Sequence, residues 1–215
     1  MIKPDKLRFG TSGIPLSTNP YDTINGINQV KKLNLDAMEL EFVRSINVSK
    51  EKAPLVKEVA KKNDIILTCH SSYFINLNAK EKPKWHASIQ RIVQSAKITY
   101  LCGGYSVCFH PAYYMKENPQ DVYKKVKEAI SLILKQLKEE NIEIWVRPET
   151  AGKLTQFGNL REVINLSYEL DDVLPCIDFS HIHALSNGKY NTTQEFNEVI
   201  TLMEKKLGKD ALNNV

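Results

Sequence analysis

The chain has 215 residues, of which 42% are apolar and 25% charged, and its formal net charge is +4. This is the size and composition of one soluble globular domain, and it excludes a disordered or fibrous chain. No apolar run approaches the roughly 20 residues of a membrane span, and the first ten residues, MIKPDKLRFG, lack the apolar region of a signal peptide. The weakly basic balance is compatible with a phosphate-bearing substrate.

Six short apolar runs alternate with helical patterns along the chain. The runs predict buried parallel strands at Leu7–Gly10, Ala37–Phe42, Ile65–His70, Ser106–His110, Ile142–Val146 and Leu174–Phe179. Helical periodicity occurs at Lys50–Lys62, His86–Leu101, Asp121–Glu140 and Leu160–Leu170. A capping box of Thr192 and Glu195 begins a last helix, which extends through Leu207.

This alternation of strand and helix predicts βαβ units and an α/β fold with a parallel sheet. A doubly wound open sheet usually carries a glycine-rich loop after its first strand, but the segment GTSGIP lacks that pattern. We therefore predict a TIM-type β/α barrel with about six of the usual eight units. Because an unclosed barrel would expose sheet edges, we expect residues 1–215 to form a single barrel domain that is truncated at its C-terminal end.

Four cysteines, Cys69, Cys102, Cys108 and Cys176, are spaced too irregularly for a C-x-x-C motif, so a zinc–thiolate site is not expected. Three of them lie in apolar, strand-like runs, where a free thiol behaves as a small buried apolar group. Without a secretion signal, this pattern predicts reduced thiols and a cytoplasmic protein.

Metal-binding side chains follow four of the predicted strands. These side chains are His70, His110, Glu149 and Asp178, and His181 comes three residues after the last of them. The C-terminal ends of parallel strands converge on one mouth of a barrel, and His, Glu and Asp bind zinc and similar divalent ions. Each residue alone has an ordinary explanation, such as a helix cap by Asp178. Together they predict a shared metal site.

Two acidic residues of the second predicted strand are ambiguous. Glu39 and Glu41 share one face of it, because alternate residues of a strand point the same way. We expect the pair to point into the barrel lumen or mouth and to be a structural pair at the rim, with a role of Glu41 in the site as the alternative. Arg147 beside Glu149 is likewise compatible with an ion pair at the rim.

The same segments resemble a known family. HSSYFINL (70–77), FHPAYY (109–114), PETAGK (148–153) and CIDFSHIHA (176–184) are similar, in order and spacing, to motifs of the endonuclease IV family of apurinic/apyrimidinic endonucleases. This family lies within the xylose isomerase-like barrel superfamily, and the resemblance spans Leu7 to about Leu207. It implies a TIM barrel with a trinuclear zinc site that hydrolyses the phosphodiester 5′ to an abasic site in DNA repair.

The resemblance also implies a ligand set. His70, His110 and Glu149 would hold the first zinc ion, and Glu149, as the catalytic residue, would bridge to a second ion that Asp178 also binds. His181 would bind the third. The family's other ligands lie on its seventh and eighth units, beyond the last residue of this sequence. The second and third ligand sets are therefore incomplete here.

The family resemblance further implies contacts to DNA that contains abasic sites. Tyr73 and Phe74, with Arg44 from the preceding loop, would enter the DNA at the lesion and replace lost stacking. Simple packing of the loop is the alternative for the two rings. Two other functions stay open: a divalent-metal sugar isomerase or epimerase of the same superfamily, which needs a small closed pocket, and a metal- or DNA-binding fragment without catalysis.

Overall fold

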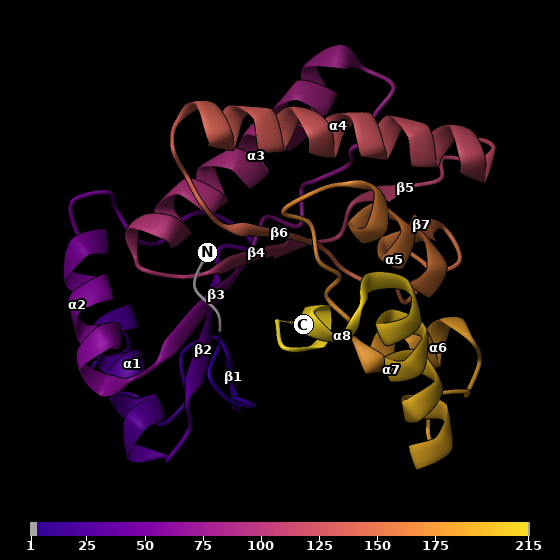
Figure 1. Ribbon diagram of the computed structural model, residues 1–215. Helices are drawn as coiled ribbons and strands as arrows, with labels where there is room; N and C mark the ends of the chain where they lie inside the picture. The colour runs from indigo at the N-terminus through magenta and orange to yellow at the C-terminus, as the bar shows by residue number, and fades with distance from the viewer. Residues whose placement is uncertain (1–3, 215) are drawn as a thin grey trace.

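A parallel sheet forms the centre of the computed structural model, which describes residues 4–214 (Figure 1). Its strands are β1 (Gly10–Ser12), β2 (Ala37–Glu41), β3 (Ile66–His70), β4 (Ser106–Phe109) and β6 (Trp145–Pro148), and they pair in the order β1-β2-β3-β4-β6. Every pair is parallel. Sequential parallel pairing is the pattern of a β/α barrel wall and confirms the predicted fold class.

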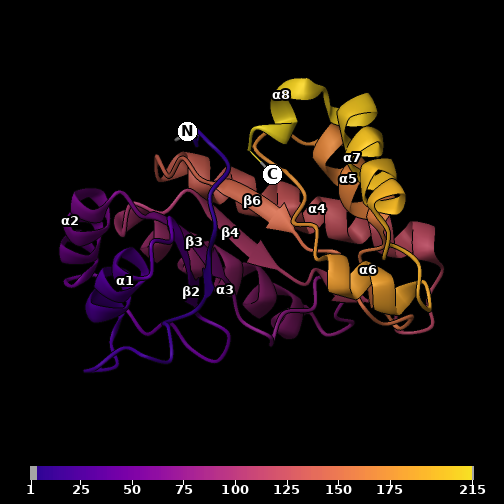
Figure 2. The ribbon, with the colours of Figure 1, turned by 90° about the horizontal axis from the view of Figure 1, so that it is seen from below.

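Eight helices are present among the described residues. They are α1 (Thr23–Lys32), α2 (Ala53–Asn63), α3 (Lys82–Leu101), α4 (Pro119–Glu139), α5 (Leu160–Glu169), α6 (Phe179–Leu185), α7 (Thr193–Leu207) and α8 (Lys209–Leu212). Helices α1 to α4 connect the strands and cover one face of the sheet. The last four gather at one end of the sheet, beyond β6 (Figure 2). Within residues 4–214, no helix combines the length and apolarity that crossing a bilayer requires.

The main hydrophobic core lies between the strands and helices α1 to α4, and a second, smaller apolar cluster joins α5, α6 and α7. Met38 and Leu40 of β2 are buried, whereas Glu39 and Glu41 alternate with them on the inner face of the sheet. The predicted apolar stripe of α4 is buried against the same core. The predicted capping box at Thr192 and Glu195 is present and begins α7 at the next residue. Polar side chains such as Glu39 and Glu41 therefore occupy the inner face of the sheet.

The first and fifth predicted strands are displaced. Strand β1 begins at Gly10 rather than Leu7, because the side chains of Leu7 and Phe9 are 77% and 63% exposed and have no core to face. Strand β6 begins at Trp145 rather than Ile142. Asn141 adopts a left-handed conformation (φ 56°), and the N–H of Ile142 donates to the end of α4, so this segment completes the helix instead.

The sixth predicted strand is irregular. Parallel bridges join Val173 to Val146 and Cys176 to Glu149, so the segment lies beside β6 as expected. Pro175 between them has no N–H to donate, and α6 already begins at Phe179. The prediction of a regular strand through Phe179 is therefore wrong: the segment makes only isolated bridges at Val173 and Cys176, and a helix begins at Phe179.

Contacts that the sequence analysis did not anticipate join the loops at the mouth. The two-residue strands β5 (Ala112–Tyr113) and β7 (Gln156–Phe157) pair antiparallel, linking the loops that follow β4 and β6. The buried amide of Asn78 donates to the carbonyl of Tyr113 at 3.0 Å, and Asn76 accepts from the N–H of Tyr113 at 3.2 Å. Three successive loops therefore form one braced rim.

Candidate metal centre

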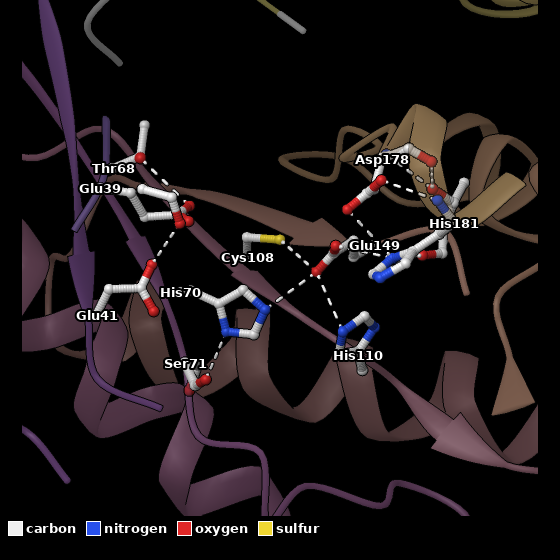
Figure 3. Close-up of polar contacts among 12 residues, drawn as sticks. Glu39, Glu41, Thr68, His70, Ser71, Cys108, His110, Glu149, Asp178 and His181 are labelled. Atoms are coloured by element: carbon white, nitrogen blue, oxygen red, sulfur yellow. Dashed lines mark hydrogen bonds and ion pairs between the residues drawn. The ribbon is translucent and has the colours of Figure 1, made fainter. Parts of the chain in front are cut away.

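A carboxylate at the mouth is surrounded by imidazoles from three other segments (Figure 3). Glu149, which follows β6, is only 5% exposed. Its Oε2 lies 3.1 Å from Nε2 of His70 and 3.6 Å from Nε2 of His110, and its Oε1 lies 3.3 Å from Nδ1 of His181. We call Glu149, these three histidines and Cys108 the Glu149 cluster.

Sheet register places the first members of the cluster side by side. His70 ends β3 and pairs in register with Glu41 on one side and Cys108 on the other. The ring of His70 is oriented by Nδ1, which lies 2.8 Å from the carbonyl of Ser71. His110 comes directly after β4, so its ring lies at the same mouth.

Backbone contacts fix Glu149. Its N–H donates to the carbonyl of Phe109 at 3.0 Å, which continues the β4–β6 pairing past the end of the strand. Gly158 has a φ of +126°, and a Cβ there would lie 2.8 Å from the carbonyl oxygen of Glu149. Only glycine combines that conformation with so close an approach.

Asp178 and His181 come from the start of α6. Asp178 caps this helix, because its Oδ1 accepts from the N–H of His181 at 2.9 Å. Its other oxygen, Oδ2, lies 3.4 Å from Nδ1 of His181. The His181 ring also packs closely on Gly152, where an added Cβ would lie 3.0 Å from Cδ2 of the ring. The capping explanation for Asp178 is therefore correct, and it leaves one carboxylate oxygen beside the cluster.

Two groups of donor atoms are close enough to share an ion. In each, the ligand atoms lie within 4.8 Å of one another: His70, Cys108 and Glu149 form one group, and His110, Glu149 and His181 form the other. Glu149 belongs to both. The set expected for a first ion, His70 with His110 and Glu149, is therefore divided between the groups, and Asp178 lies outside both.

The charges of the cluster are coupled. Burial disfavours a charged His70, but its hydrogen bonds to Glu149 and the Ser71 carbonyl outweigh this and raise the pKa of His70 to about 9. Burial also acts to raise the pKa of Glu149, yet the hydrogen bond from His70 and the nearby imidazole of His110 bring it below its ordinary value. For His110, burial dominates and lowers the pKa. One ionised carboxylate thus lies among imidazoles of different basicity.

The donors of the cluster fit a divalent ion. Imidazole, carboxylate and thiol groups are zinc ligands, and here they converge on the inner face of the sheet. Buried polar atoms are normally hydrogen-bonded, whereas Nδ1 of His110 is buried without a partner among the described residues. His70, Cys108, His110, Glu149 and His181 are therefore the residues that could hold metal.

Glu39 is a neighbour of the cluster that sequence reasoning assigned to the rim. Burial raises the pKa of Glu39 to about 7, although the charge of His70 partly opposes the rise. Its Oε2 accepts from the hydroxyl of Thr68 at 3.5 Å, while Glu41 accepts from Ser12 at 2.9 Å. The inward orientation of Glu39 agrees with the expectation from the alternation in AMELE (37–41), in which the two large apolar residues occupy the outer face.

Of the three residues expected to contact DNA, Tyr73 lies against the cluster, whereas Phe74 and Arg44 line an open groove to which no cluster residue contributes. Tyr73 and Phe74 are 57% and 66% exposed, and Arg44 is exposed as well. The Tyr73 ring lies edge-on to His70 with centroids 5.5 Å apart, and its N–H donates to the carbonyl of Val43 at 3.0 Å. The loops after β2 and β3 therefore present these side chains together.

Fold and cluster together define a β/α barrel wall with a candidate metal centre at its mouth. The chain belongs to the xylose isomerase-like TIM barrel family, whose model matches residues 27–215. An uncharacterized protein of Methanocaldococcus jannaschii is 42% identical over 209 residues, which is 97% of this chain and 74% of that protein. A probable endonuclease 4 of Aster yellows witches'-broom phytoplasma is 26% identical over 70% of this chain, which spans only 53% of that relative.

Solved structures share the fold. Endonuclease IV from Thermus thermophilus superposes with a TM-score of 0.72 at 19% identity, covering 95% of this chain and 74% of its own. D-Psicose 3-epimerase from Clostridium cellulolyticum gives the same TM-score at 16% identity, with 93% and 71% covered. The predicted resemblance to endonuclease IV is thus confirmed at the level of family and fold, and sugar epimerases share that fold equally.

Proposed function

We propose that this chain carries the metal centre of a zinc-dependent apurinic/apyrimidinic endonuclease, which hydrolyses the DNA phosphodiester 5′ to an abasic site. The observation that carries the proposal is the Glu149 cluster, with the exposed ring of Tyr73 against it and the exposed ring of Phe74 next in the same loop. A DNA enzyme needs such rings at an open mouth, because they must reach an extrahelical sugar. A small-sugar enzyme needs a closed pocket instead.

Three further features support a nucleic-acid substrate. Arg44 and Arg91 line the same groove as Phe74, and a guanidinium is suited to phosphate. The net charge is +4, which favours a polyanion. Relatives with the printed name endonuclease 4 match 61–74% of the chain.

Each part of the site has a distinct role in this proposal. A bound divalent ion would supply Lewis-acid polarisation of a phosphate oxygen and activation of water. Glu149 is the catalytic carboxylate: its Oε2 faces His70 and His110, and its Oε1 faces His181. His70, His110 and His181 would hold the ions, with Asp178 beside them. Tyr73 and Phe74 occupy the space that a displaced nucleotide leaves, and Arg44 binds the backbone.

An incision assay tests the proposal. The substrate is a DNA duplex with one tetrahydrofuran abasic site, and the protein is loaded with Zn²⁺ after chelation. We expect a nick 5′ to the lesion, abolished in His70→Ala and retained in His86→Ala, a control that removes an exposed histidine of α3 away from the cluster. Metal binding with affinity for abasic DNA but no nick would instead identify a non-catalytic binding fragment.

A sugar isomerase or epimerase is the second candidate, and one observation favours it. Glu39, whose pKa is raised to about 7, is suited to proton transfer near neutral pH, and D-psicose 3-epimerase shares the fold. Incubation with D-fructose or D-tagatose and Mn²⁺ or Co²⁺ tests it. Epimerised ketose that disappears in Glu39→Gln, together with intact abasic DNA, would favour this candidate over the endonuclease.

A further inference from the structure

Cys108 lies on the inner face of the sheet, within the cluster. It pairs in register with His70 on one side and Arg147 on the other. Alternation along β4 turns Val107 and Phe109 toward the helices, so Cys108 faces the same interior as Glu149. Its side chain is 3% exposed. The thiol is therefore largely shielded from bulk water and lies against the cluster.

The distances around one oxygen match the edges of a coordination tetrahedron. Oε2 of Glu149 lies 3.1 Å from Nε2 of His70 and 3.4 Å from Sγ of Cys108. Donors bound to one tetrahedral zinc ion are about 3.4 Å apart for nitrogen and oxygen, and about 3.6 Å for sulfur and oxygen, given the usual bond lengths. The two observed distances are therefore only a few tenths of an ångström shorter than those between donors that bind the same zinc ion.

We infer that Cys108 is a thiolate ligand of the ion held by His70 and Glu149. The inference rests on the proposed metal centre and adds a sulfur donor to it. On binding, the ion takes the place of the thiol proton that Cys108 donates to Glu149, and that proton leaves to solvent. A bond from sulfur to the ion forms as the S–H bond breaks, with no change of oxidation state.

The consequence is a pair of unlike metal positions. The first has nitrogen, sulfur and oxygen donors from His70, Cys108 and Glu149, and the second has the nitrogen and oxygen donors of His110, His181 and Glu149. A thiolate selects zinc and other thiophilic ions over Mn²⁺ and Mg²⁺. The first position is therefore specific for a thiophilic ion, whereas the second admits a wider range.

The alternative role for Cys108 is that of a protonated thiol hydrogen-bonded to Glu149 and Cys176, because the hydrogen bond with Cys176 and burial hold its pKa well above the ordinary value. Cobalt absorption separates the two, because only a thiolate bound to Co²⁺ gives a sulfur-to-cobalt charge-transfer band in the near ultraviolet. The matched control is Cys69→Ala: Cys69 is equally buried and precedes His70, but it faces the helices. We expect the band in the wild-type protein and in Cys69→Ala, and its loss in Cys108→Ser.

Wild-type protein that shows cobalt d–d bands without the charge-transfer band would overturn the inference and leave the metal centre standing. A band that persists in Cys108→Ser would overturn it as well. No bound cobalt at all would refute the metal centre and this inference with it. As a second measurement, competition titration should show Cys108→Ser losing about 10- to 100-fold in Zn²⁺ affinity while Mn²⁺ affinity changes much less; equal losses for both ions would count against a sulfur ligand.

Discussion

Nε2 of His70 lies 3.1 Å from Oε2 of Glu149, although 79 positions separate the two residues in the chain. The contact joins the ends of β3 and β6, which are not neighbours in the sheet, since β4 lies between them. Glu149 thus reaches across the strand that carries Cys108. It is the residue that the two donor groups share.

Replacing Glu149 by Gln should therefore affect both groups at once. The amide keeps the size of the side chain but removes its charge and one acceptor oxygen. We expect the bound metal to fall from the wild-type content to near zero, measured by inductively coupled plasma mass spectrometry after dialysis. Glu58→Gln, which changes an exposed carboxyl of α2, is the control and should retain the wild-type content. Full metal content in Glu149→Gln would show that the carboxylate is not a ligand.

The raised pKa of Glu39 predicts a pH dependence of stability in the metal-free protein. In the folded state Glu39 titrates at about 7, compared with 4.5 for an ordinary glutamate. Since the unfolded chain gives up this proton more readily, stability decreases as pH rises from 4.5 to about 7, by at most about 3 kcal/mol.

Glu39→Gln removes this titration. The free energy of unfolding of the variant, relative to the wild type, should therefore increase between pH 4.5 and pH 8. Urea unfolding in the presence of a chelator, followed by circular dichroism at both values, measures the difference. A difference that does not vary with pH would mean that Glu39 is not perturbed by its burial.

Asn78 is expected to be important for the rim. Its buried amide donates to the carbonyls of Tyr113 and Tyr114 at 3.0 and 3.5 Å, joining two mouth loops. Asn78→Ala leaves these carbonyls without that donor, so we expect a loss of about 1–3 kcal/mol in the free energy of unfolding. Asn78→Asp should lose at least as much, because a carboxylate would face two carbonyl oxygens. A change below about 0.5 kcal/mol in both variants would contradict this role.

Tyr73 and Phe74 should contribute to DNA affinity. Stacking of a base on an aromatic ring is worth about 1–3 kcal/mol, so the double variant Tyr73→Ala, Phe74→Ala should bind an abasic duplex at least tenfold more weakly. Fluorescence anisotropy measures this. Tyr168→Ala is the control, because Tyr168 is an exposed ring on α5 and forms no part of the mouth. If the double variant and the control bind the abasic duplex with equal affinity, the two rings serve only to pack the loop.

Much of the fold could be predicted because the spacing of apolar residues in the sequence matches the positions that are buried in the structure. Strand β2 ends one residue before its predicted end at Phe42, and β3 begins one residue after its predicted start at Ile65. The strand predictions failed where the local backbone conformation opposes the strand that an apolar run would otherwise form. The left-handed turn at Asn141 and the missing N–H of Pro175 both override apolar runs that resemble strands.

The site could be predicted only in part, for a related reason. Strand ends converge in a barrel, so His70, His110 and Glu149 could be grouped from their positions alone. Their division into two groups depends on the direction in which each imidazole ring points, and no sequence pattern predicts that direction. Cys108 was set aside because thiolate motifs are recognised by short spacings, whereas its partners come from other strands.

Glu149 belongs to both donor groups, each of which would hold an ion, and a crystal of the zinc-loaded protein tests this most directly. Data collected at the zinc absorption edge should show two anomalous peaks, one between His70 and Glu149 and one between Glu149 and His181, each about 2.0–2.3 Å from its ligand atoms. A peak elsewhere, or no peak within that distance of Glu149, would contradict the account.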